Sequence, residues 1–211
     1  NAIAFPSFNT FAAPKRISDW DQYNVRIDHR LTDRDFLYGS YSNSDESQLS
    51  PALRFLGGDV FPQSDQLWTA TYVRTITPSI VNEVRFGHND SKTFRTSEGS
   101  NGLNYAQSVF GLKNTSPNPF DFGIPAFSTT GFGAIGSISE AIGADDENYQ
   151  FVDNLSVTRG RHTFKTGIQI IHEKFFQITD FNGNPTFSFD GRFTGTSGIG
   201  VADFLLGIPY Q

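Results

Sequence analysis

Residues 23–30 read Tyr23-Asn24-Val25-Arg26-Ile27-Asp28-His29-Arg30, and this alternating stretch sets the expected fold class. Apolar or aromatic side chains alternate with polar or charged ones along it. A period of two is typical of a β-strand with one apolar face and one wet face. The run Thr32-Asp33-Arg34-Asp35 that follows is typical of a tight turn. The sequence therefore predicts a β-hairpin that begins here.

The same alternation returns along the chain. Strands are expected at 21–31, 36–44, 66–77, 80–94, 149–158, 162–178 and 186–193, and a short helix or strand at 201–207. Their connections are short at 32–35, 77–79 and 159–161, and long at 45–65, 95–148 and 179–185. Because short and long connections alternate, tight turns should gather at one end of the sheet and long loops at the other, as in outer-membrane barrels.

The expected fold is therefore all-β: an antiparallel meander of β-hairpins, forming either part of an outer-membrane-type barrel or an open sheet. Residues 1–20 are expected to form an N-terminal arm, with one short strand near residues 3–8. Residues 21–211 are expected to form one barrel-derived sheet segment, interrupted by a long irregular loop at 95–148.

Composition excludes several classes of protein. The chain has 211 residues, a net charge of −6 and no cysteine. An acidic chain lacks the basic face of a dedicated nucleic-acid binder. Without cysteine this chain has no disulfides, thiolate metal sites or cysteine nucleophile. It also has no methionine, and its first residues do not resemble a signal peptide, so we interpret it as an internal piece of a longer precursor or a processed product.

Several runs resemble the barrel of TonB-dependent receptors, and most closely the Oar-like subgroup that carries a carboxypeptidase-regulatory-like domain. The matching runs are residues 23–30, 33–35 and 38–42, then TPSIVNEVRFG at 77–87, DNLSVTRGRHTFKTG at 153–167 and ADFLLGIP at 202–209. The resemblance implies a bacterial outer-membrane location and uptake of bulky substrates, powered through an energy-coupling partner. The family's plug, coupling box and carboxypeptidase-like module have no counterpart in these residues, and about seven strands stand where the family barrel has about 22.

An incomplete barrel would be a sheet with two bare edges, which are templates for pairing with another chain. The first hypothesis is therefore a non-catalytic structural fragment that pairs with copies of itself, as an oligomer or β-rich filament, either in the outer membrane or released outside the cell. Candidate self-association residues are Ile168, Ile170, Phe187 and Phe189, which lie in apolar segments of low charge. The alternative is a wall and outer-loop segment of an intact receptor in contact with outer-membrane lipid. A secreted β-sandwich that binds glycans is a third class.

Candidate chemical sites are few. The four histidines show no metal-ligand spacing, and no nucleophile motif of a hydrolase is present, so no enzyme and no cofactor are predicted. Calcium is the one ion considered, because it prefers hard oxygen ligands. Its candidate ligands are Asp145 and Asp146 in the long loop, and Asp180, Asn182 and Asn184 in the turn that follows the sixth strand.

Overall fold

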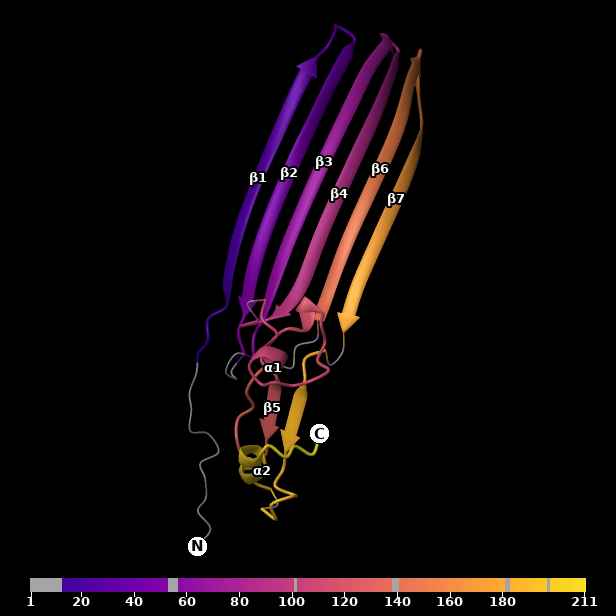
Figure 1. Cartoon of the computed structure of the whole chain (residues 1–211). Coiled ribbons are helices and arrows are strands. Elements are labelled where there is room, and N and C mark those ends of the chain that lie inside the picture. The colour runs from indigo at the N-terminus through magenta and orange to yellow at the C-terminus, as the bar shows by residue number, and fades with distance from the viewer. Residues whose placement is uncertain (1–12, 53–56, 101, 138–140, 181–182, 197) are drawn as a thin grey trace.

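The computed structural model describes residues 13–52, 57–100, 102–137, 141–180, 183–196 and 198–211. Its main feature is one six-stranded antiparallel sheet in the order β1-β2-β3-β4-β6-β7. The strands are β1 (Ile17–Arg30), β2 (Asp35–Ser50), β3 (Asp59–Thr77), β4 (Ile80–Ser97), β6 (Ala141–Arg159) and β7 (His162–Asp180). Figure 1 shows them side by side as a tilted, curved wall. This confirms the predicted antiparallel meander of hairpins.

The three tight turns lie together at one end of the wall, and the long connections lie at the other (Figure 1). Two of the turns have only two residues between their strands: Pro78 and Ser79 between β3 and β4, and Gly160 and Arg161 between β6 and β7. Gly160 has a φ of 59°, in the left-handed region that glycine enters without penalty and that the favoured two-residue hairpin turns use. The predicted sorting of short turns and long loops by end is therefore correct.

The strands are longer than the sequence indicated, and the long loops are correspondingly shorter. β2 continues to Ser50 and β3 begins at Asp59, so strand occupies much of the predicted loop at 45–65. β4 ends at Ser97 and β6 begins at Ala141, so the predicted loop at 95–148 is wrong at both ends. Residues 42–48 are polar on both faces, which removes the alternation that marks a strand. β1 begins at Ile17, inside the predicted arm, and residues 3–8 lie outside the described residues.

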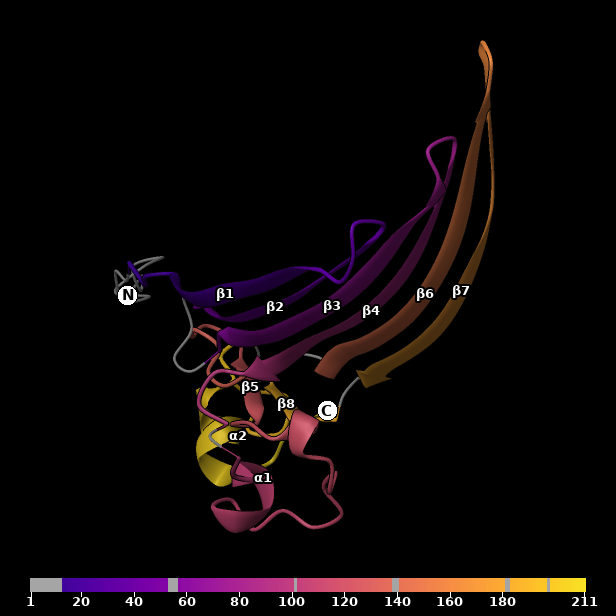
Figure 2. The same ribbon diagram turned by 90° about the horizontal axis from the view of Figure 1, so that it is seen from above.

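A second, smaller unit lies beyond the loop end of the wall (Figure 2). It contains α1 (Tyr105–Ser108), the 3-10 turn η1 (Pro119–Asp121), β5 (Ala126–Thr129), β8 (Thr186–Phe189) and α2 (Val201–Leu206). β5 and β8 pair in parallel as a separate two-stranded sheet. The strand predicted at 186–193 thus ends at Phe189 and does not extend the meander.

Aromatic rings form the core of this loop unit. Phe127 stacks on Phe187 with ring centroids 5.5 Å apart, and Phe204 of α2 lies edge-on to Phe189 at 5.3 Å. Asp203, 1% exposed, accepts hydrogen bonds from the amide nitrogens of Phe193 and Thr194 and from the Thr194 hydroxyl. Buried carboxylates are stable only when donors surround them in this way, so Asp203 holds the chain that precedes α2 against that helix.

The two edge strands of the wall, β1 and β7, each pair with one neighbour only. β1 is exposed along its whole length, and β7 along nearly all of it. The sheet is therefore open in the part of the chain that the structure describes. Within these residues no helix has both the length and the apolar character needed to cross a membrane.

Candidate functional site

The two faces of the wall differ in chemistry, because directly paired residues of neighbouring strands point to the same side. One register row crosses all six strands with apolar side chains and one glycine: Ile27, Gly39, Ala70, Phe86, Phe151 and Ile170. We call the side that carries it the apolar face. The predicted assignment of Tyr23, Val25 and Ile27 to one face of the first strand is confirmed by this register.

Aromatic rings border the apolar row on the side of the loops. They come from the next row on the same face: Tyr41, Trp68, His88, Tyr149 and His172. The rings of Tyr41 and Trp68 lie 4.1 Å apart, and those of His88 and Tyr149 lie 4.4 Å apart. The rings thus form a nearly continuous belt across the strands.

Polar rows bound the apolar face above and below. Along β4 they are marked by Asp90 and Asn82, each four residues from Phe86; along β7 they are marked by Lys174 and Thr166, each four residues from Ile170. Eight residues at ~3.4 Å each, on strands tilted by ~40°, span roughly 21 Å in height. That is close to the ~25 Å apolar band of outer-membrane barrels. Within this height one acidic side chain interrupts the face, because Asp153 of β6 lies two residues from Phe151 on the same side and accepts a hydrogen bond from Asn82.

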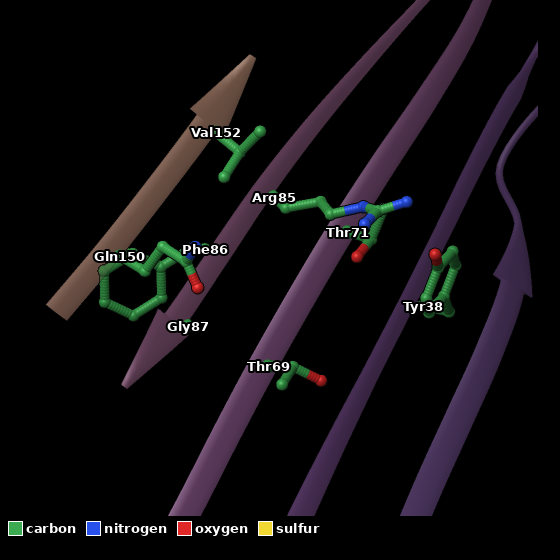
Figure 3. Close-up of a pocket in the computed structure, with 8 residues that line it drawn as sticks. All are labelled: Tyr38, Thr69, Thr71, Arg85, Phe86, Gly87, Gln150 and Val152. Carbon is green, nitrogen blue, oxygen red and sulfur yellow. The ribbon is translucent and has the colours of Figure 1, made fainter. Parts of the chain in front are cut away.

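The opposite face is mostly polar and carries a hollow (Figure 3). Its volume is about 340 Å³, and its lining is Tyr38, Thr69, Thr71, Arg85, Phe86, Gly87, Gln150 and Val152. Gly87 creates much of this space. A Cβ at Gly87 would lie no closer than 3.9 Å to its nearest neighbour, the Cβ of Gln150. The missing side chain therefore leaves a gap in the row between Thr69 and Gln150.

Charged groups sit at the rim of the hollow in compensated pairs. Arg26 pairs with Asp28 at 2.7 Å and lies over the ring of Tyr38, 4.5 Å from its centroid. Arg85 pairs with Glu83 at 2.7 Å. Both pairs are open to solvent, so each contributes little to stability. These side chains instead offer hydrogen-bonding groups to a polar solute in the hollow.

The described residues contain no cluster of three or more histidine or acidic side chains placed to hold a metal. The hollow offers hydroxyl, amide and guanidinium groups on a rigid sheet. Such a surface suits contact with water and polar solutes.

A comparison with protein families identifies the class of protein to which this sheet belongs. The sequence model of the outer membrane beta barrel domain matches residues 1–211. The chain belongs to the outer membrane beta barrel family. No curated protein and no solved structure gives a match to it.

In an outer membrane beta barrel, the apolar face contacts lipid and the polar face lines the interior. Outer-membrane barrels also carry girdles of aromatic residues near the membrane–water interfaces and have short turns at their periplasmic end. The family places the protein in the outer membrane, as the resemblance implied.

The structure separates the four candidate self-association residues into two pairs. Ile168 and Ile170 lie on the apolar face of the edge strand β7 and are 57% and 56% exposed. Phe187 and Phe189 pack instead inside the loop unit, where Phe189 is 4% exposed. These two rings already have aromatic partners within the chain, and self-association through them stays a prediction.

The calcium candidates also separate. Asp145 and Asp146 lie in β6, not in a loop, and Asp145 pairs with Lys92 at 3.7 Å. Asp180 is the last residue of β7, and Asn184 is buried in the loop unit at 8% exposure. Asn182 lies outside the described residues.

Asp121, a buried carboxylate at the end of η1, was not among the predicted site residues. Burial raises its pKa, and contact with the carboxyl of Asp180 raises it further, against the opposing effect of the Ser116 hydroxyl. The two aspartates are far apart in sequence, and a carboxylate after an Asn-Pro-Phe turn has no distinctive spacing. Only the tertiary structure brings them together.

Proposed function

We propose that the six strands form a section of the wall of a TonB-dependent transport barrel of the Oar-like type. The observation that supports this most directly is the apolar row, unbroken from β1 to β7, backed by a polar face with the hollow at Gly87. The wall itself is non-catalytic. It separates lipid from a polar passage for a bulky substrate, and the resemblance implies that an energy-coupling protein supplies the work.

The open edges agree with a larger wall. Known single-chain barrels begin at eight strands, and this sheet has six. In lipid, each unpaired backbone group costs several kcal/mol, so bare edges are not tolerated. Further strands of the same barrel, paired with β1 and β7, would remove both edges.

A second candidate is pairing of β1 or β7 with another copy of this chain, as an oligomer or filament. The exposed strand β7, with Ile168 and Ile170 on one face, supports it. It is the weaker candidate, because edge pairing alone does not explain why one face of the sheet is apolar and the other polar.

Cysteine labelling of the intact protein in its own outer membrane tests the wall. This chain contributes no cysteine, so single substitutions report one position each. T69C and Q150C on the polar face should react with a membrane-impermeant maleimide once the interior is reached from outside. F86C and F151C on the apolar face should react only with a lipid-soluble reagent. Equal labelling of both faces by the impermeant reagent would refute the proposal that the sheet separates lipid from a polar interior.

Crosslinking distinguishes the two candidates. With one cysteine on β1, as V25C, and one on β7, as I170C, the self-pairing hypothesis predicts disulfide-linked dimers of the whole protein. The barrel-wall proposal predicts no more disulfide-linked dimer than a Q169C control gives, because the side chain at position 169 faces the interior.

A further inference from the structure

Two carboxylates meet where the wall joins the loop unit. Asp121, at the end of η1, is only 7% exposed. It lies against the turn after β7: a Cβ built on Gly183 would fall 2.2 Å from the carboxyl carbon of Asp121. Asp180 ends β7, and its carboxyl lies close enough to that of Asp121 to raise the pKa of Asp121.

Two buried side-chain oxygens at this junction, the Oδ1 atoms of Asp121 and Asn184, have no hydrogen-bond donor. Oδ2 of Asp121 accepts a hydrogen bond from the Ser116 hydroxyl at 2.5 Å, but its buried Oδ1 accepts none. Asn184 follows Gly183 directly and is also buried. Its amide nitrogen donates to the carbonyls of Ile124 and Ser137, both at 3.0 Å, while its buried Oδ1 accepts no hydrogen bond.

No ion pair found among the described residues offers compensation, since none involves Asp121 or Asp180. A buried carboxylate without donors is costly, and a second carboxylate beside it adds like-charge repulsion. A hard divalent cation removes both penalties at once. Calcium accepts six to eight oxygen ligands, including carboxylates, amide oxygens and waters, in flexible geometry.

We propose that Asp121 and Asp180 bind one Ca²⁺ between them, with the Oδ1 of Asn184 as a third protein ligand. Neither of the strand acids Asp145 and Asp146 belongs to this site. The ion would tie η1 of the loop unit to the end of β7, segments that are 59 residues apart in sequence (180 − 121). Its role is to hold the loop unit against the mouth of the wall. The proposal does not depend on what the barrel transports.

Calcium titration of the intact, EDTA-stripped protein in detergent tests the site, with CaCl₂ as the only probe. Asp121→Asn and Asp180→Asn keep side-chain size and remove one charge each. Asp145→Asn is the matched control, because it removes an acid of the same wall outside the site. The wild type should bind one Ca²⁺ with a Kd of roughly 0.1–1 mM, the range of extracellular modules. Each site variant should lose at least about tenfold in affinity, and the control should keep it.

Limited proteolysis gives a second readout. Calcium should slow cleavage within residues 98–125 of the wild type and of Asp145→Asn, and should leave cleavage of the two site variants unchanged. A gel shift between heated and unheated samples establishes that each variant is folded, and if one of the two is not, the other alone decides. Binding that survives both site substitutions, or is absent from the wild type at millimolar calcium, would overturn the proposal.

Discussion

Placing a charge at Ile170 should separate the two faces of the wall most sharply. Ile170 stands at the β7 end of the apolar row, midway along its strand between the polar residues Lys174 and Thr166, each four residues away. At ~3.4 Å per residue and a ~40° tilt, each polar row is roughly 10 Å away, so the side chain sits near the middle of the hydrocarbon. Arginine at the bilayer midplane of a barrel costs about 2–4 kcal/mol.

Ile170→Arg should therefore lower the free energy of unfolding by about 2–4 kcal/mol, a factor of roughly 30 to 900 in the folding equilibrium. The adjacent Gln169→Arg provides the control. Its side chain points to the polar face, so its cost should stay within about 0.5 kcal/mol. Denaturant unfolding of the intact protein in lipid vesicles, followed by tryptophan fluorescence, measures both.

Two results would contradict this reasoning. Equal losses for the two variants would show that the faces are not separated as lipid and interior. A larger loss for Gln169→Arg would show that the register is shifted by one residue, since such a slip exchanges the faces.

Three further predictions follow from particular contacts. Gly143→Ala should destabilise the wall by about 1–3 kcal/mol, because the new Cβ would fall 2.2 Å from the Phe94 ring. In the same unfolding assay the control Gly87→Ala should be nearly neutral. A neutral Gly143→Ala would contradict the close packing of Gly143 against Phe94. Asp203→Ala should raise the hydrogen-exchange rates of the backbone amides at residues 191–196 by well over tenfold, because each hydrogen bond lost to a charged acceptor is worth about 1.5–3 kcal/mol. Unchanged exchange rates would show that Asp203 does not anchor this segment. Burial raises the pKa of Asp203, but hydrogen bonds from Thr194 and nearby backbone amides outweigh it and leave the pKa below 3.8. Its stabilisation should therefore be complete above pH 3.8 and fade only as the pH falls through that lowered pKa, so protection lost already near pH 5 would refute it.

The alternation of side chains was sufficient to predict the hairpins and the tight turns. Along residues 23–30 each side chain has to point to one face or the other, and the apolar side chains all lie on the same face. This is local information, and the register confirms it. The extent of the strands was not predictable in the same way, because residues 42–48 and 141–148 lack a consistent apolar face to mark them. They are strands because a neighbour supplies backbone partners.

The sequence by itself determined that this protein is a meander of β-hairpins whose strands alternate between an apolar and a polar face, since a period of two depends only on neighbouring residues. The tertiary structure decided everything that depends on distant ones. It paired β5 with β8, buried Phe189 and placed Asp121 against Asp180. The physical reason is that these contacts close long loops, so their free energy comes from packing and burial that no local pattern records.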